Sequence, residues 1–380
     1  MNKILNLAST LTKYFIKSPR AGAPLRGLLY VTNRCNMQCM SCGSWQRTDN
    51  HDEMTTEAIF DVIEQMRQIG VKVIYIFGGE PTLRSDIFDI IRLCKSSNMY
   101  TEMVTNGSIL HNLSKAEELV DTGLDKLCVS MDGPEAIHDK IRGRSNSFRK
   151  AIECITSVIK ARDNNKRKLP LVEAACTISA LNYTYIEELT ELLNGLGLFE
   201  VKIRHMGVFM PMDIETMKHV MAPIDIDMPP LFSVGADILL TKENICELRP
   251  ILRRIQHKYD TGLLDYVPHI EPPLYSVDDW NIGRDISGCL HLWSQICVNA
   301  KGQVIPCIWY DGINMGDCSN QGLKKAWNGE KFQYFRTHYT RLTACKKCCY
   351  FYLNFTENFM RALQIPNFPF KKLITERIKR

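Results

Sequence analysis

Three cysteines within eight residues form the part of the sequence best suited to chemistry. They are Cys35, Cys39 and Cys42, and they follow an apolar run, residues 28–31, that predicts a β-strand. Three thiolates on one loop cannot complete the four-ligand shell of a structural zinc site. They suit one corner of an iron–sulfur cubane, because clustered thiolates hold such clusters and three ligands for four irons leave one iron open. A zinc knuckle completed by a distant His or Cys is the alternative that the triplet leaves open.

Three more polar or glycine-rich turns follow later strands. They are Gly78-Gly79-Glu80-Pro81, Thr105-Asn106-Gly107 and Ser130-Met131-Asp132-Gly133-Pro134. Each alone is ordinary turn chemistry. Together with the cysteines they make four successive strand ends, and in parallel α/β folds the chemistry gathers at that edge of the sheet. The combination therefore predicts one site at the carboxyl ends of the strands.

Strand and helix patterns alternate from residue 27 to residue 205, which implies a parallel sheet. The predicted strands are 27–32, 71–77, 100–105, 126–131, 171–178 and 200–204, and the predicted helices are 55–69, 86–97, 113–122, 148–161 and 183–193. Successive right-handed crossovers with helices of similar length favour a barrel. We therefore expect an α/β fold, a partial (β/α)6 TIM-like barrel, followed by a small C-terminal α+β domain.

With these motifs in place, residues 25–205 resemble the radical S-adenosylmethionine (SAM) superfamily. The resemblance implies that Cys35, Cys39 and Cys42 hold a 4Fe-4S cluster whose open iron takes the amino and carboxylate groups of SAM. It implies that the cofactor is contacted by Gly78, Gly79, Glu80, Pro81, Asn106, Ser130, Asp132 and Arg142. Arg142 would pair with the SAM carboxylate, or else form a surface salt bridge.

The sequence departs from the superfamily at Ser41, because the residue before the third cysteine is usually aromatic and packs near the adenine. Trp45 and Tyr75 are weak candidates for that role. The chemistry that the resemblance implies is one-electron cleavage of SAM and removal of a hydrogen atom from the substrate by the 5′-deoxyadenosyl radical. A flavodoxin- or ferredoxin-type protein would supply the electron.

A second group of cysteines lies near the C-terminus. Cys289 and Cys307 bracket a predicted hairpin over residues 296–305, and Cys345 and Cys348 follow a predicted helical stretch, 323–336. Four thiolates in two pre-organised pairs fit zinc or a second iron–sulfur cluster. The region resembles the SPASM auxiliary-cluster domain in its shortened "twitch" form, which implies one auxiliary 4Fe-4S cluster held by these four cysteines.

Two further cysteines, Cys318 and Cys349, have no ligand role in that pattern. Either could be a spare ligand, a hydrogen-atom donor to a substrate radical, which makes it a candidate catalytic residue, or an inert thiol.

Composition limits the partners and the compartment. The net charge is +5 with no long basic block, so nothing indicates nucleic acid. No apolar stretch approaches the roughly 18 residues that span a bilayer. Residues 1–20 predict an amphipathic helix that packs on its own domain, with contact to a membrane surface as the alternative. Fifteen cysteines without a secretion signal indicate a reducing cytoplasm.

The expected division places an N-terminal helix at 1–24, the barrel at 25–210, a bridging segment at 211–285, the auxiliary-cluster domain at 286–350, and a helix with a basic tail at 351–380. The expected reaction is a net oxidation of a carbohydrate-like small molecule, with the auxiliary cluster as electron acceptor. The roughly 25 residues before the first strand are too few for a separate peptide-binding domain, which tilts this expectation away from peptides. The alternatives are modification of a ribosomal peptide, redox-neutral epimerisation with a cysteine hydrogen donor, and a non-enzymatic metal-binding protein.

Overall fold

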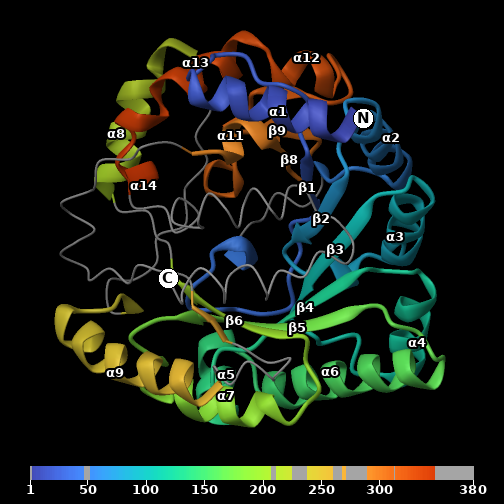
Figure 1. The fold of residues 1–380 in the computed structure, drawn as a ribbon, viewed down its shortest axis with the longest axis vertical. Coiled ribbons are helices and arrows are strands. Elements are labelled where there is room, and N and C mark those ends of the chain that lie inside the picture. The colour runs from blue at the N-terminus through green and yellow to red at the C-terminus, as the bar shows by residue number, and fades with distance from the viewer. Residues whose placement is uncertain are drawn as a thin grey trace.

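A single curved sheet organises the molecule (Figure 1). The structure, a computed structural model, describes residues 2–46, 52–206, 211–224, 238–259, 268–270, 289–311 and 313–346. Within them the sheet has ten strands in the order β10-β9-β8-β1-β2-β3-β4-β5-β6-β7.

The strands from β1 to β7 are parallel neighbours in chain order. They are β1 (Arg26–Thr32), β2 (Val73–Gly78), β3 (Tyr100–Thr105), β4 (Lys126–Ser130), β5 (Leu171–Ile178), β6 (Glu200–His205) and β7 (Pro268–Ile270). Five helices cover the outer, convex side (Figure 1): α2 (Thr56–Gln68), α3 (Ile87–Ser96), α4 (Leu113–Asp121), α6 (Ser147–Asn164) and α7 (Ile186–Asn194). The predicted partial α/β barrel is confirmed.

The predicted small C-terminal α+β domain is confirmed, and its strands extend the barrel sheet. Strand β8 (Gln295–Val298) pairs in parallel with β1, and β9 (Gln303–Ile305) and β10 (Gly316–Asp317) continue the sheet in antiparallel pairs. The first strand of an open barrel has an edge of unpaired backbone groups that a further strand can satisfy. The hairpin from the C-terminal region fills that place.

Eight further α-helices are found within the described residues. They are α1 (Asn2–Phe15), α5 (Glu135–Arg142), α8 (Pro211–Met221), α9 (Lys242–Tyr259), α11 (His291–Ser294), α12 (Leu323–Trp327), α13 (Glu330–His338) and α14 (Thr343–Lys346). The predicted helical stretch 323–336 is wrong as one element. It breaks at Asn328, whose side chain accepts a hydrogen bond from the Ala21 N–H (2.8 Å). Helices α5 and α8 were not predicted, and the predicted helix after residue 351 lies outside the described residues.

The two faces of the sheet are filled differently. Outward side chains such as Ile74, Leu127 and Val201 are fully buried against the helices. The inner face carries ion pairs, among them Lys126–Glu173 (3.2 Å). Lys126 and Glu173 lie in the first halves of β4 and β5, away from the strand ends that carry the predicted site.

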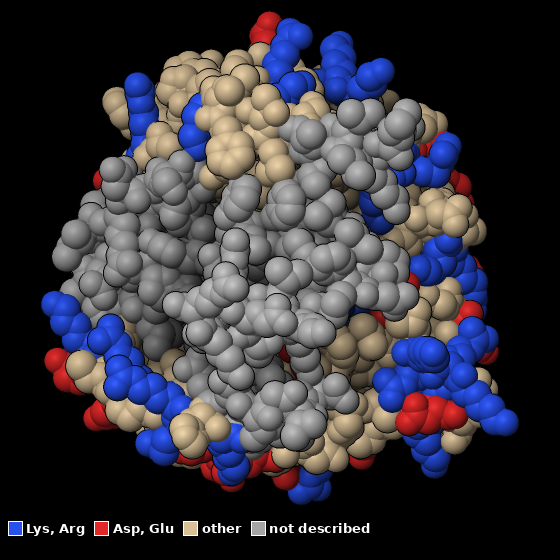
Figure 2. All heavy atoms as spheres, in the orientation of Figure 1, with Lys and Arg blue, Asp and Glu red and all other residues tan. Residues whose placement is uncertain are grey.

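Charged side chains surround the face shown in Figure 2, where Lys and Arg lie among Asp and Glu, including a row over α9. Two cations of α9 pair with α7, Arg254 with Glu187 (2.6 Å) and Lys258 with Glu191 (2.5 Å). These contacts dock one helix on the other. Among the described residues, no helix is long and apolar enough to cross a membrane.

Candidate active site

The cysteine loop, residues 33–42, leaves the end of β1 at a point set by an acidic side chain. The Glu53 carboxylate accepts hydrogen bonds from the Asn33 N–H (2.6 Å) and the Thr32 hydroxyl (2.9 Å). Glu53 also lies 3.4 Å from the Arg34 guanidinium. The chain therefore turns out of the sheet directly before Cys35. Sequence reasoning missed Glu53, which lies eleven residues beyond the last cysteine of the loop.

The Gly-Gly-Glu-Pro turn packs directly on this loop. The Gly79 N–H donates to the Thr32 carbonyl (2.9 Å), and the Glu80 N–H donates to the Arg34 carbonyl (2.8 Å). A Cβ at Gly79 would lie 2.2 Å from the Arg34 carbonyl oxygen. Gly79 therefore serves the close approach of two segments of the chain itself.

Glu80 ties the ends of β2 and β3 together. Its side chain is 1% exposed, and its carboxylate accepts from the Thr82 hydroxyl (2.5 Å), the Thr105 hydroxyl (2.7 Å) and the Asn106 N–H (2.7 Å). Burial raises the pKa of Glu80, and these hydrogen bonds oppose the rise. Pro81 starts the short 3-10 helix Pro81–Leu83. Both carboxylate oxygens of Glu80 already have partners within the chain. The predicted contact of Glu80 with SAM stays a prediction.

An amide network joins the loop to the end of β3. The Asn106 amide donates to the Asn36 side-chain oxygen (2.9 Å), and the Asn36 amide donates to the Ser108 hydroxyl (2.9 Å). The structure places Asn106 beside the loop, and its contact with SAM stays a prediction. Asn36 was missed as a site residue, although an amide between the first two cysteines was a signal that could have shown it.

At the end of β4, Asp132 is 2% exposed and pairs with Arg142 at 2.7 Å. The Thr177 N–H donates to the same carboxylate (3.1 Å), and the Asp132 N–H donates to His138 Nδ1 (3.1 Å). The Arg142 guanidinium also reaches Cys39, with Nη1 3.8 Å from Sγ. Ser130 is the half-buried last residue of β4. The structure thus brings Asp132, Arg142 and Cys39 together.

The three thiols lie close enough to influence one another electrostatically. Burial raises the pKa of Cys35 to about 11, and the nearby Cys39 and Cys42 add to the rise. Burial also raises the pKa of Cys39, while the positive charge of Arg142 opposes that rise. Cys42 is exposed. A bound metal must therefore displace protons from buried thiols.

The three thiols on one loop fit the thiolate donors of an iron–sulfur cubane. Among the described residues, no three His, Cys, Asp or Glu side chains surround a point where one metal ion could bind. Thiolates around a cubane bind separate irons, so they need not converge on one point. A buried cation beside Cys39 also suits the negative charge of an iron–sulfur cluster.

The two aromatic candidates for the adenine lie in different places. The Trp45 indole N–H donates to the Cys39 carbonyl (3.2 Å), and its side chain is 37% exposed, so it lies against the cysteine loop. Tyr75 lies inside the barrel, stacked on Phe77 (6.1 Å between ring centroids) and below the Arg26 guanidinium (4.9 Å). Of the two, Trp45 alone contacts the loop.

The C-terminal cysteines gather around two tyrosines. Cys289, Cys307 and Cys345 are half-buried against the same core. The Cys289 N–H donates to the Tyr339 hydroxyl (3.1 Å), and the Tyr310 hydroxyl lies 3.3 Å from Cys345 Sγ. Burial raises the pKa of Tyr339, and the charges of two of these thiols add to the rise. The remaining predicted ligand, Cys348, and the candidate donor Cys349 lie outside the described residues.

The two groups of cysteines lie at opposite ends of the β-strands. Cys289 precedes β8, Cys307 follows β9, and β8 runs parallel to β1. Cys289 and Cys307 therefore lie at the end of the sheet where β1 begins, whereas the cysteine loop lies where β1 ends. A seven-residue strand is about 20 Å long, which sets the scale of the separation. The inner face between the edges is apolar near Tyr30 and Phe77, whose ring centroids are 5.0 Å apart.

Cys318 lies away from the strand-end residues. It is buried between the hairpin and α2, where its N–H donates to the Gly302 carbonyl (2.9 Å) and its own carbonyl accepts from the Gln65 amide (3.2 Å). Burial raises the pKa of its thiol to about 12. The position is that of a packed thiol on the outer side of the sheet. Its predicted role as a hydrogen donor finds no support in this geometry.

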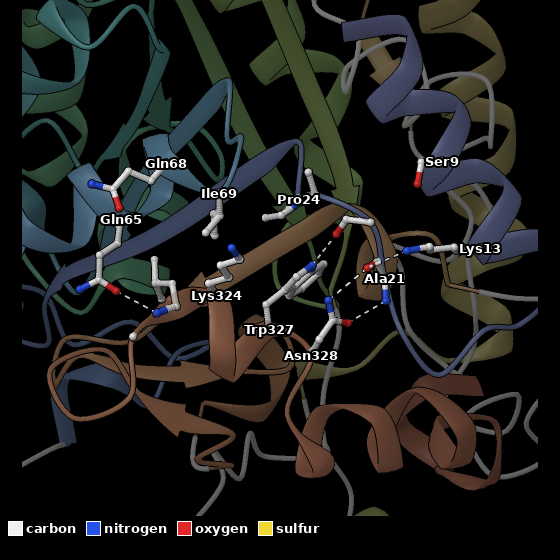
Figure 3. A pocket seen from close by; sticks show the side chains of 14 residues that line it. Ser9, Lys13, Ala21, Pro24, Gln65, Gln68, Ile69, Lys324, Trp327 and Asn328 are labelled. Atoms are coloured by element: carbon white, nitrogen blue, oxygen red, sulfur yellow. Dashed lines mark hydrogen bonds between the residues drawn. The ribbon is translucent and has the colours of Figure 1, made fainter. Parts of the chain in front are cut away.

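A pocket of about 760 Å³ lies between α1, α2 and α12 (Figure 3). Lys13, Gln65, Lys324 and Asn328 are among the side chains that line it, and Trp327 donates a hydrogen bond to the Gly22 carbonyl at its wall (2.7 Å). None of the residues predicted to carry chemistry lines this pocket. It lies beside the start of β1, away from the cysteine loop.

Comparison with known families decides what this constellation is. The radical SAM superfamily model matches residues 29–172, and the model of the iron–sulfur cluster-binding domain SPASM matches residues 289–349. The chain therefore contains a radical SAM domain followed by a C-terminal SPASM domain. These domains bring a 4Fe-4S cluster that binds SAM, and auxiliary iron–sulfur binding at the C-terminus.

Curated relatives match part of the chain. The chain is 33% identical over 134 residues to a PqqA peptide cyclase of Bradyrhizobium diazoefficiens, covering 35% of this chain and 35% of the relative. It is 35% identical over 170 residues to a probable GTP 3′,8-cyclase of Methanocaldococcus jannaschii (41% and 56%). An AdoMet-dependent heme synthase of Methanosarcina barkeri is 30% identical over 169 residues (44% and 46%). The matches span about a third to a little over half of these relatives.

Two solved structures share the fold over most of the chain. SuiB of Streptococcus suis bound to S-adenosylmethionine aligns with a TM-score of 0.61 at 15% identity, covering 81% of this chain and 66% of that one. The anSMEcpe complex with AdoMet and the Cp18Cys peptide aligns with a TM-score of 0.59 at 16% identity, covering 93% and 100%. At these identities the likeness concerns the fold.

Proposed function

We propose that the enzyme uses SAM to remove a hydrogen atom from its substrate and transfers the remaining electron to an auxiliary cluster, which gives a net two-electron oxidation. One observation carries this proposal. Thiol groups lie at both ends of the strands of one continuous sheet, with the barrel interior between them. The outcome would be a dehydrogenation or a new bond within the substrate.

The residues of the chain have separate tasks in this proposal. Cys35, Cys39 and Cys42 would hold the SAM-binding cluster, which when bound supplies the electron that cleaves SAM to the 5′-deoxyadenosyl radical. Cys289, Cys307, Cys345 and Cys348 would hold the auxiliary cluster.

The apolar wall of Tyr30 and Phe77 would exclude water beside the substrate. Around the cysteine loop, Glu80 and Asn36 fix the loop in place, so the reacting groups meet in a set geometry.

We propose a peptide as the substrate class, ahead of the carbohydrate-like molecule that the sequence led us to expect. Relatives that match this chain include PqqA peptide cyclases, and the fold neighbours include SuiB bound to its precursor peptide SuiA. Relatives named for GTP and heme chemistry also match this chain, at 35% and 30% identity, so the curated relatives alone do not select one substrate class.

The test is anaerobic reconstitution with iron and sulfide, followed by turnover with SAM, a reductant and two substrate panels, one of peptides and one of sugars and cyclitols. A product two mass units lighter that forms with 5′-deoxyadenosine only from the peptide panel supports the proposal. Turnover only with the sugar panel refutes the peptide assignment. In deuterated water an oxidation adds no solvent deuterium to the product, whereas incorporation would indicate the epimerase alternative.

The cellular setting follows the same proposal. We propose a cytoplasmic enzyme that receives electrons from a flavodoxin- or ferredoxin-type protein. The fifteen cysteines of the chain suit a reducing compartment.

A further inference from the structure

The C-terminal end of α5 (Glu135–Arg142) lies directly against the cysteine loop. The Met40 N–H donates to the Ile141 carbonyl (2.8 Å), and the Gln38 N–H donates to the Arg142 carbonyl (3.1 Å). Carbonyls at a helix C-terminus lack partners within the helix, and here they hold the loop. The corner after α5 is therefore a support for the segment that carries Cys39.

The residues that follow make this corner rigid. Gly143 has φ +62°, and a Cβ there would lie 2.4 Å from the Gln38 carbonyl oxygen, so only glycine fits. The Arg144 guanidinium donates to the Asn36 carbonyl (2.9 Å). The Asp139 carboxylate accepts from the Ser147 hydroxyl (2.7 Å) at the start of α6. Residues 141–144 thus contact the loop by backbone and side chain.

Arg142 is held in one orientation within this corner. Its side chain is 16% exposed, Nη2 pairs with the Asp132 carboxylate at 2.7 Å, and Nη1 points at Cys39 Sγ at 3.8 Å. Asp132 is in turn fixed by the Thr177 N–H (3.1 Å). A guanidinium held by a carboxylate on one side offers its other N–H groups in a fixed direction. That direction is the sulfur of a predicted cluster ligand.

We propose that Arg142 is a positioning residue for the cluster ligand Cys39 and that it raises the reduction potential of the cluster on the cysteine loop. This inference rests on the proposed function, because it needs a cluster on Cys35, Cys39 and Cys42. It replaces the expected pairing of Arg142 with the SAM carboxylate.

The physical reason is electrostatic. Hydrogen bonds to the sulfurs, nearby charge and exclusion of solvent set the potential of an iron–sulfur cluster. Reduction adds one electron and makes the cluster more negative, so a buried cation at a ligand sulfur stabilises the reduced state more than the oxidised state. Asp132 keeps the cation in place and partly offsets its charge. The net effect is an easier one-electron reduction.

The experiment compares reconstituted protein carrying Arg142→Gln, Arg142→Lys or the control Arg149→Gln. All three also carry Cys289→Ala/Cys345→Ala, which removes the auxiliary cluster so that only the cluster on the cysteine loop is measured. Arg149 belongs to the same α5–α6 region and pairs with Glu135 at 2.6 Å, with 66% of its side chain exposed. The midpoint potential is measured without SAM, with titanium(III) citrate as electron source, and SAM affinity is measured separately.

We expect Arg142→Gln to lower the equilibrium constant for reduction about tenfold, which is 59 mV for a one-electron couple. Arg142→Lys should give a smaller drop, because a lysine keeps the charge but not the two-sided contact, and Arg149→Gln should change nothing. If Arg142→Gln loads no cluster, Arg142→Lys carries the test.

An unchanged potential in the loaded Arg142 variants overturns the inference, and weakened SAM binding alongside it would assign Arg142 to the SAM carboxylate. A background protein with intact Arg142 that binds no iron would instead refute the proposed function.

Discussion

The cysteine loop and the C-terminal cysteines are built in opposite ways. The loop has its three thiols within eight residues, and polar contacts from β2, β3 and α5 fix its backbone. The C-terminal thiols come from segments separated by tens of residues. They meet because aromatic rings pack, such as Trp293 on Tyr339 (6.0 Å) and Tyr310 on Phe335 (5.4 Å).

The polar anchor of each region shows the same contrast. Near the loop, buried charges are paired, as Arg142 is with Asp132. In the C-terminal region Arg336 is 2% exposed, lies over the Trp327 and Phe332 rings at 4.4 and 4.1 Å, and donates to the Leu292 carbonyl (2.8 Å). Burial lowers the pKa of Arg336 to about 9. We therefore expect single backbone and polar substitutions to reduce stability strongly at the loop and less strongly in the C-terminal region.

The largest effect should come from Gly79→Ala. The added methyl would meet the Arg34 carbonyl, which is backbone and cannot move aside, so we expect about 3 kcal/mol of destabilisation and poor cluster loading. The control is Gly195→Ala, where no atom lies within 4 Å of the added methyl and the backbone is helical. That variant should be neutral or slightly stabilised. Urea unfolding and iron analysis measure both; equal behaviour of the two variants would contradict the close packing of the turn on the loop.

Glu80→Gln should have the next largest effect. The amide has one oxygen where the carboxylate has two, so donors from Thr82, Thr105 or Asn106 lose their partner, at a cost of about 2 kcal/mol. Glu64→Gln, which changes an exposed pair with Arg67, should unfold at nearly the wild-type urea concentration. If Glu80→Gln unfolds at the wild-type urea concentration, the carboxylate does not hold the strand ends together.

His138 should make the barrel side sensitive to mild acid. Burial lowers its pKa from 6.5 to about 4, and its neutral Nδ1 accepts the Asp132 N–H. The unfolded chain takes up a proton near pH 6.5 and the folded protein does not, so stability is lost as pH falls below that value. Between pH 7 and about 5.5, wild type should lose roughly 1 kcal/mol more than His138→Asn, whose amide oxygen can accept the same N–H.

Urea unfolding of the apoprotein at both pH values gives the numbers. A His138→Asn variant with the wild-type pH slope would show that this histidine is not the acid-sensitive group.

Tyr310→Phe should have the smallest effect. It removes one hydroxyl 3.3 Å from Cys345 Sγ, and sulfur is a weak hydrogen-bond partner, so we expect a loss of about 0.5 kcal/mol with full iron content. Thermal unfolding and iron analysis check this. Loss of half the iron would mean that the C-terminal site depends on a single polar contact as strongly as the loop does.

The spacing of residues in the sequence predicted the features that are local in the chain. The barrel strands, the hairpin and the cysteine loop all follow from periodicity and from adjacent motifs, and the strand-end turns did converge, as for Asn106 beside Asn36. Contacts between distant segments were not predictable in this way. Pairing of β8 with β1, the support of the loop by α5, and the ties made by Glu53 depend on which surfaces meet after folding. No local sequence pattern predicts which of these distant surfaces contact each other.

The most direct test of two separate thiol sites is iron analysis and SAM cleavage in two variants. The account predicts about eight irons per chain in reconstituted wild type. It predicts that Cys35→Ala/Cys39→Ala/Cys42→Ala keeps about half of them and forms no 5′-deoxyadenosine, whereas Cys345→Ala keeps cleavage and loses turnover. Formation of 5′-deoxyadenosine by the triple variant, or a wild-type protein that binds only zinc, would contradict it.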